Sequence, residues 1–147
     1  MSKLLARLQD ASRSGAYRAP RSDEILDALR DAGFDLARVD LARASDKDAL
    51  LANLAAALAF PQWFGRNWDA LEDCLTDLAW RAADRHVLLI EGFGELRARH
   101  PDDFGVLLDI LATCAQYWKE RGRPFFAVFL DPEHALALPD LFRPRRA

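Results

Sequence analysis

Residues 86–90 read His-Val-Leu-Leu-Ile, and residues 125–130 read Phe-Phe-Ala-Val-Phe-Leu. Each is a continuous apolar run of strand length, which is typical of a strand buried within a parallel sheet. A third short strand is predicted over residues 34–41, which follow Gly33. These three runs decide the fold class, because helical patterns separate them along the chain.

Apolar residues at helical spacing occupy most of the remaining sequence. We expect helices over residues 3–10, 22–31, 49–59, 68–78 and 101–121, and a break in regular structure over residues 12–20. Strands separated by helices form parallel sheets with right-handed crossovers. The sequence therefore predicts an α/β fold with a three-stranded parallel sheet packed with helices, mainly on one face, and an extra N-terminal helical segment.

The chain has 147 residues, which fits one globular domain with a single core. We divide it into an N-terminal helical extension over residues 1–33, packed on the same domain, a main α/β domain over 34–131 and a C-terminal tail over 132–147.

The net charge of −3 argues against direct binding to nucleic acid. No run approaches the roughly 20 apolar residues that span a bilayer. Cys74 and Cys114 lie outside any metal-binding motif and indicate a reduced compartment. We expect a cytoplasmic monomer that binds no membrane.

Residues 60–78, FPQWFGRNWDALEDCLTDL, combine crowded aromatic residues with a concentration of carboxylates. Four acidic residues share one predicted helical face: Asp69, Glu72, Asp73 and Asp77. An apolar stripe takes the opposite face and comprises Trp68, Leu71, Leu75 and Leu78. The simplest interpretation is a solvated surface. However, like charges at i, i+4 destabilise a helix by about 0.2–0.5 kcal/mol per pair, and this helix has two such pairs without an interleaved lysine.

Trp63 and Phe64 precede this helix in a loop, where aromatic residues often anchor a partner. We expect at least one of them to pack into the core.

Catalytic chemistry is not indicated, and we expect a protein that is not an enzyme and has no cofactor. The three histidines, His86, His100 and His134, are scattered, and we interpret each as an ordinary surface or strand-edge residue. Carboxylates beside Cys74 would oppose thiolate formation. A ladder of carboxylates on a straight helix does not wrap a metal ion, so no metal site is predicted.

The pattern Pro61-x-Trp63-Phe64-Gly65-x-Asn67-x-Asp69-Ala70-Leu71-x-Asp73-Cys74-Leu75-Thr76 resembles the signature of the barstar family of ribonuclease inhibitors. The resemblance extends over roughly residues 34–131. It implies a three-stranded parallel sheet with helices, in agreement with the periodicity. It also implies a protein that binds the active site of a basic ribonuclease, barnase-like or another secreted nuclease toxin, and presents carboxylates where RNA phosphates would lie.

The resemblance assigns roles residue by residue. Asp73 matches the family's central carboxylate, and Asp69 matches a second acid on the guanine-recognition side. The implied partner-binding surface comprises Trp63, Phe64, Gly65, Asn67, Asp69, Glu72, Asp73, Thr76 and Asp77.

The sequence departs from the family pattern at the rim of this surface. Glu72 stands where the family has a Trp, and Asp77 and Leu78 replace a Gly-Trp pair. Tyr117 or Glu120 falls where the family has a further carboxylate. The alternative function is therefore a barstar-fold binding or immunity module for a different basic toxin or regulatory partner, without ribonuclease inhibition.

Overall fold

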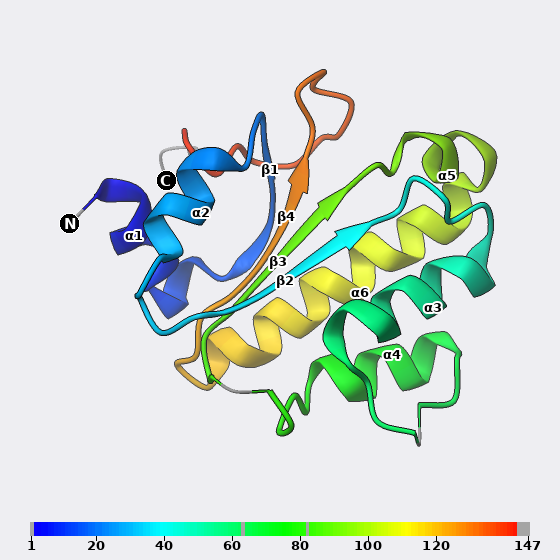
Figure 1. The fold of residues 1–147 in the computed structure, drawn as a ribbon, viewed down its shortest axis with the longest axis horizontal. Helices are drawn as coiled ribbons and strands as arrows, with labels where there is room; N and C mark the ends of the chain where they lie inside the picture. Colours follow the sequence, from blue (N-terminus) through cyan, green and yellow to red (C-terminus); the bar gives the residue numbers. More distant parts are fainter. Residues whose placement is uncertain (1, 63, 82, 144–147) are drawn as a thin grey trace.

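The computed structural model describes residues 2–62, 64–81 and 83–143. Four strands and their connecting helices form one α/β assembly (Figure 1). In chain order the elements are α1 (Lys3–Leu8), a 3₁₀ turn η1 (Ala11–Arg13), β1 (Gly15–Ala19), α2 (Asp23–Leu29), β2 (Asp35–Asp40), α3 (Lys47–Leu58), α4 (Trp68–Leu75), β3 (His86–Glu91), α5 (Gly94–Arg99), α6 (Pro101–Glu120) and β4 (Phe125–Leu130). The predicted fold class is confirmed, whereas the prediction of three strands was wrong.

The sheet is parallel throughout and has the strand order β1-β4-β3-β2. The strand missing from the prediction is β1, which lies in the segment where we expected a break. It pairs with β4 in a register that places Gly15 opposite Phe126 and Ala19 opposite Leu130. Gly-Ala-Tyr-Arg-Ala contains no apolar run, so its strand conformation comes from pairing with β4 rather than from its own pattern.

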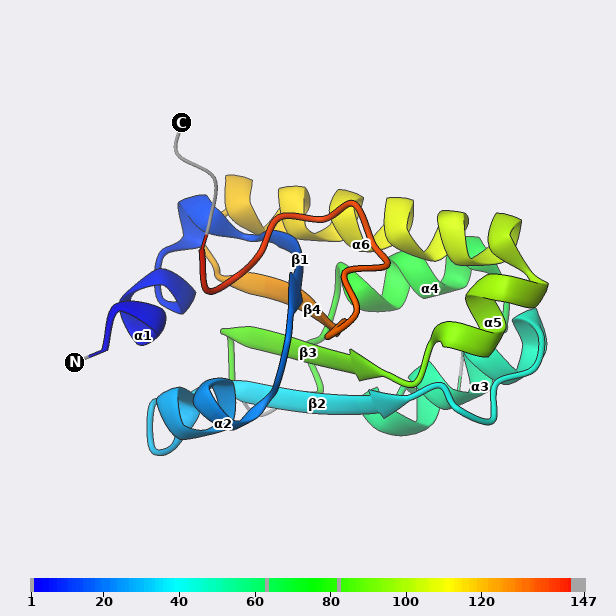
Figure 2. The same cartoon turned by 90° about the horizontal axis from the view of Figure 1, so that it is seen from above.

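One face of the sheet carries the larger core. Helices α3, α4, α5 and α6 lie on this face and cover the side chains of Val39, Leu88, Ile90, Ala127 and Phe129 (Figures 1 and 2). The long helix α6 is the main element of this layer: its buried side chains include Phe104, Leu111 and Trp118. This layer positions α4, because α4 packs directly on α6.

The opposite face carries a second core, so the expectation that mainly one face is covered was wrong. Val87 and Leu89 of β3 and Phe126 and Val128 of β4 point into this second core. The covering residues come from both ends of the chain: Leu8 of α1, Ile25 and Leu29 of α2, and Leu141 of the tail. Strands β3 and β4 are apolar on both faces, and burying the second face requires the residues outside 34–131.

Arg18 of β1 joins the N-terminal segment to the C-terminal tail. Its backbone N–H donates to the Pro139 carbonyl at 2.9 Å, and its carbonyl accepts from the Leu141 N–H at 2.9 Å. Its side chain lies 3.6 Å from the Asp140 carboxylate. The tail therefore covers the free edge of β1, which would otherwise expose unpaired backbone groups. The division of the chain at residues 34 and 131 stays a prediction.

The helix α5 was not predicted, because it is short and carries few apolar residues. The predicted end of α6 is confirmed: the helix stops at Glu120, and Gly122 takes a positive φ of 69°. Within the described residues, no helix is both long and apolar enough to cross a membrane.

Candidate functional site: an acidic helix and its preceding loop

Helix α4 begins at the predicted residue. Asn67 is its N-cap, and the side-chain oxygen of Asn67 accepts a hydrogen bond from the Ala70 N–H at 2.7 Å. Leu71, Cys74 and Leu75 are buried on the inward face. This cap and this apolar face hold the outward face of the helix in a fixed orientation.

The acidic residues of the 60–78 segment are exposed, as the periodicity predicted. Asp69, Glu72 and Asp73 lie on α4, and none of them forms an ion pair among the described residues. The expectation that Thr76 and Asp77 extend the helix by another turn was wrong, because α4 ends at Leu75. The free protein therefore presents a group of carboxylates that no cation among the described residues neutralises.

The residues after Leu75 have specific local roles. The Thr76 hydroxyl donates to the Glu72 carbonyl at 2.8 Å and so caps the last turn. The Asp77 carboxylate accepts from the Ala79 N–H at 3.2 Å and remains exposed. Leu78 is buried with a positive φ of 55°, which turns the chain away from the helix axis. Asp77 therefore lies in the turn that follows α4 rather than on the helix itself.

The loop before α4 is anchored by aromatic packing. The ring centroids of Phe64 and Phe60 lie 4.9 Å apart in an edge-to-face contact. The ring centroid of Phe60 lies in turn 6.0 Å from that of Trp80. Phe64 is half-buried against the main core, which confirms that one of the two loop aromatics packs inward. Trp63, the other predicted anchor, lies outside the described residues.

Gly65 is exposed in the same loop. A Cβ at this position would lie 3.3 Å from the Asn67 amide nitrogen, so a side chain here would crowd the cap.

Helix α6 packs against α4. The indole N–H of Trp118 donates to the Leu75 carbonyl at 2.8 Å, in a buried contact that fixes the end of α4. Tyr117 and Glu120 are the two candidates for the position at which the family has a further carboxylate. Glu120 is exposed, and its carboxylate accepts a hydrogen bond from the Gln116 amide at 3.1 Å. Tyr117 is half-buried, and the Arg121 guanidinium lies 3.5 Å from its ring centroid. Whether either residue replaces the family carboxylate stays a prediction.

The cysteines beside this site are not nucleophiles. Burial, with contributions from Asp73 and Asp77, raises the pKa of the Cys74 thiol to about 11. Burial, with a contribution from Glu72, raises the pKa of the Cys114 thiol to about 12. Both thiols are therefore protonated at neutral pH, and both are free and buried.

Sequence reasoning did not identify two positively charged side chains near the N-terminus of α4, those of Lys47 and Arg66. Lys47, at the start of α3, has its ammonium over the half-buried Trp68 ring, 5.4 Å from the ring centroid. Arg66 is exposed and takes a positive φ of 52°. Helical periodicity could not indicate either feature, because one depends on the packing of α3 beside α4 and the other on loop geometry.

One histidine differs from its predicted environment. His86 is buried at the start of β3, rather than a surface or strand-edge residue, and its Nδ1 lies 3.0 Å from the Asp35 carboxylate. The Arg81 guanidinium donates to the same carboxylate. This cluster connects the segment after α4 to the start of β2. The described residues contain no group of side chains suited to hold a metal ion.

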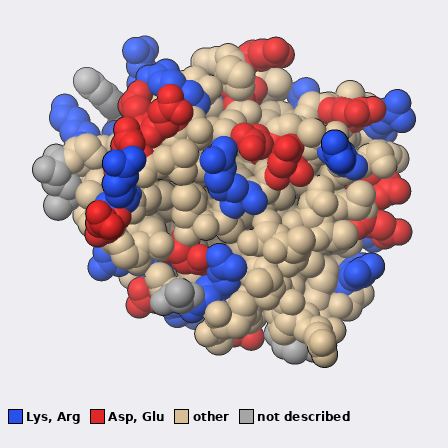
Figure 3. All heavy atoms as spheres, in the orientation of Figure 1, with Lys and Arg blue, Asp and Glu red and all other residues tan. Residues whose placement is uncertain are grey.

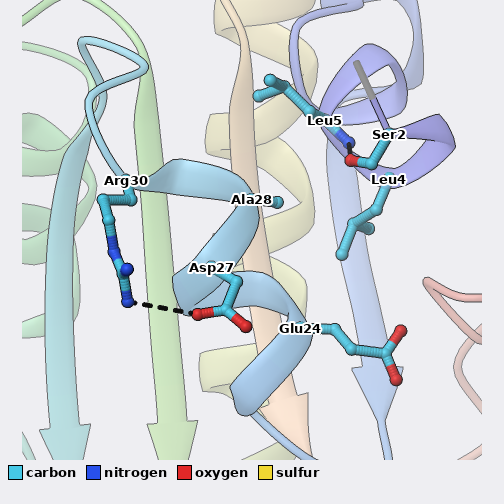
Figure 4. Close-up of a pocket in the computed structure, with 7 residues that line it drawn as sticks. All are labelled: Ser2, Leu4, Leu5, Glu24, Asp27, Ala28 and Arg30. Atoms are coloured by element: carbon cyan, nitrogen blue, oxygen red, sulfur yellow. Dashed lines mark hydrogen bonds and ion pairs between the residues drawn. The ribbon is translucent and has the colours of Figure 1, made fainter.

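On the opposite face of the sheet from α4, a groove lies between α1 and α2 (Figure 4). Leu4 and Leu5 of α1 line one side, and Glu24 and Asp27 of α2 line the other. Asp27 is already paired with Arg30 at 3.3 Å. Acidic and basic side chains are mixed over much of the face seen in Figure 3, but its lower right part, over α3, is largely uncharged. This agrees with the absence of charged residues between Asp48 and Arg66.

The fold and the site together define an α/β protein that presents carboxylates on a helix packed against its core, without a metal-binding group among its described residues. The family described as Barstar (barnase inhibitor) matches residues 34–130. This match spans well over half of the 147 residues, and the chain belongs to the barstar family. The search of curated proteins found no match.

Among solved structures, the chain is similar to one in the "Structure of Drosophila ORC bound to DNA". The TM-score is 0.53 and the identity 16%, over 86% of this chain and 35% of that one. Similarity at this level shows the fold alone, and this chain spans about a third of the length of that chain.

Proposed function

We propose that this protein binds a basic ribonuclease and blocks its active site with the outward face of α4 and the loop before it. Asp73 is the central carboxylate of the proposed surface, and Asp69 is the second. The rest of the proposed surface comprises Trp63, Phe64, Gly65, Asn67, Glu72, Thr76 and Asp77. In this role the protein acts stoichiometrically, without turnover, and needs no cofactor.

The single observation that carries the proposal is the set of unpaired carboxylates on α4 in a chain of the barstar family. Repulsion among Asp69, Glu72 and Asp73 is not relieved by any ion pair among the described residues. A cationic cleft that normally receives RNA phosphates would relieve this repulsion. Such a cleft also suits electrostatic steering, which speeds association at low salt.

The rigidity of the surface supports a role in binding. The Asn67 cap, the packing of Phe64 on Phe60 and the Trp118 contact with Leu75 hold the loop and helix in place before any partner arrives. A preorganised surface loses little conformational entropy on binding. Tight inhibition is favoured by this property.

A second candidate is a binding module for a different basic partner, without ribonuclease inhibition. The observation that favours it is the exposed Glu72, which adds charge where the family has a flat aromatic contact. Under this candidate the acidic face binds a protein whose active site stays open.

The experiment titrates purified protein into barnase and into the basic ribonucleases recovered on the immobilised protein, and measures residual RNA cleavage. We expect inhibition with a one-to-one endpoint. We expect Asp73→Ala to weaken binding by more than about 3 kcal/mol, because truncating one member of a buried charge pair leaves the other unpaired. The association rate should fall as salt rises.

The matched control is Asp23→Ala. Asp23 is also an exposed aspartate in a short helix, but α2 lies on the other face of the sheet. This variant should inhibit as the wild type does. Equal binding of the ribonuclease by wild type and Asp73→Ala would refute the proposal, and binding that leaves RNA cleavage intact would support the second candidate.

A further inference from the structure

Arg66 is the one positively charged residue of the 60–78 segment, between the loop aromatics and the carboxylates of α4. Between Lys47 and Arg81 the sequence has no other lysine or arginine. Its side chain is exposed, and among the described residues it takes part in no ion pair, side-chain hydrogen bond or ring contact. Lys47, the nearest cation in sequence before it, is by contrast placed over the Trp68 ring.

The backbone at Arg66 is in an unfavourable conformation. Its φ of 52° lies in the left-handed region, which residues with a side chain adopt at a cost in conformational energy. Glycine would occupy this position without that cost. Residues kept in such a conformation often lie at functional sites.

The dipole of α4 also disfavours a cation at this position. Arg66 directly precedes the N-cap of α4, where the helix dipole presents its positive end. Asp69 follows three residues later, yet no ion pair joins the two side chains. The free protein therefore gains no close charge pairing from this guanidinium.

The loop around Arg66 is fixed on both sides. Phe64 is anchored on Phe60, and the Asn67 side chain both caps α4 and approaches the Gly65 carbonyl at 3.4 Å. These anchors hold the backbone at Arg66, while its exposed side chain is free to reach a group on a partner. The planar guanidinium is suited to bidentate recognition of a carboxylate.

We propose that Arg66 is a specificity-determining residue that binds a carboxylate on the partner, next to the cationic cleft that receives Asp73. This inference rests on the proposed function and refines the class of partner. The cognate ribonuclease carries both signs of charge at the interface, and a ribonuclease with a uniformly cationic rim is rejected by repulsion from Arg66.

The binding test uses each purified ribonuclease that the protein inhibits in the titration above. Arg66→Gln should weaken binding about tenfold and Arg66→Glu at least about a hundredfold, because reversal adds repulsion to the lost pair. Arg85→Glu is the control for net charge: Arg85 is also exposed, and it precedes β3 at the amino end of the sheet. It should change binding little. In the Arg66→Glu background, changing one carboxylate of the ribonuclease to lysine should restore binding.

A second measurement needs no partner. Arg66→Gly and Arg66→Asn should raise the midpoint of thermal unfolding by roughly 2 °C, because both residues tolerate the left-handed conformation. A lower midpoint in both variants would show that Arg66 serves the fold, and would overturn the inference.

The outcomes separate the two proposals. If no ribonuclease is inhibited, or if Asp73→Ala binds as the wild type does, the proposed function fails and the inference fails with it. If Asp73→Ala loses binding while Arg66→Glu binds as tightly as the wild type or more tightly, only the inference fails. Loss of binding in both variants, with rescue by the lysine substitution, supports both.

Discussion

The Arg81 guanidinium donates to both carboxylate oxygens of Asp35, at 2.6 Å to Oδ1 and 2.9 Å to Oδ2. The two residues lie far apart in sequence: Arg81 follows the acidic helix, and Asp35 begins β2. Nδ1 of His86 meets the same carboxylate at 3.0 Å. Burial alone would raise the pKa of Asp35, but the hydrogen bonds from Arg81 and His86 outweigh it and hold that pKa below its usual value. This cluster ties the segment that follows the acidic helix to the central sheet.

The stability of the protein should fall as the solution becomes acidic, first because of His86. Burial lowers the pKa of His86, and the hydrogen bond to Asp35 offsets this only in part. Its buried Nε2 has no hydrogen-bond partner, so a proton there would be unsatisfied. The folded state therefore binds fewer protons than the unfolded state below about pH 6.5, and the free energy of unfolding decreases from there downward. Asp35, whose pKa is also lowered, adds a further loss below about pH 4.

Urea unfolding at pH 7, 6 and 5 checks this prediction. We expect His86→Gln to show a smaller loss of unfolding free energy over this range than the wild type, because glutamine does not titrate. His100 and His134 remain in both proteins and serve as the internal control. Parallel pH profiles would contradict the role of His86.

Gly92→Ala should destabilise the protein by about 3 kcal/mol, because the change adds both a clash and backbone strain. A Cβ at residue 92 would lie 2.5 Å from the Asp40 carboxylate and 2.8 Å from the Ala42 backbone nitrogen, and φ is 71°. Gly105→Ala is the control: it lies within α6, where an added Cβ would meet no neighbour within 4 Å, and should stabilise by about 0.5–1 kcal/mol. Chemical denaturation measures both, and equal effects would refute the contact.

Asn67→Ala should lower the free energy of unfolding by about 1 kcal/mol, because the Ala70 N–H loses its acceptor at the start of α4. Asn67→Asp keeps an acceptor there and adds a negative charge at the positive end of the helix, so it should retain wild-type stability. Thermal unfolding of the pair tests the cap. The cap would be unimportant if the alanine variant matched the aspartate variant.

Leu141→Ala should cost about 2–4 kcal/mol, because Leu141 is fully buried in the second core. Leu138→Ala, in the same tail but only partly buried, should cost less. Guanidinium unfolding curves compare the two variants. If both substitutions had equally small effects, the tail would not be part of the folded core.

Much of the fold could be predicted from local patterns. The apolar runs at 86–90 and 125–130 gave correct strands because they are buried on both faces. The carboxylates of α4 were correctly predicted to be exposed because Leu71 and Leu75 fix the inward face. The strand β1 could not be predicted, since Gly15–Ala19 is polar and small and becomes a strand only when β4 lies beside it. Arg66 carried no signal either, because its backbone conformation arises from how the loop joins α3 to α4.

The sequence by itself determined the α/β class, the strands β2, β3 and β4, the cap at Asn67 and the acidic face of α4, because each leaves a local signal in the chain: an apolar run, a helical period or a capping residue. The tertiary structure alone decided the fourth strand, the second core and the burial of His86 beside Asp35. Each of these joins segments that are distant in sequence: β1 with β4, Leu8 with Leu141, and His86 with Asp35. Such contacts depend on which segments the folded chain brings together, and periodicity within one segment carries no information about that choice.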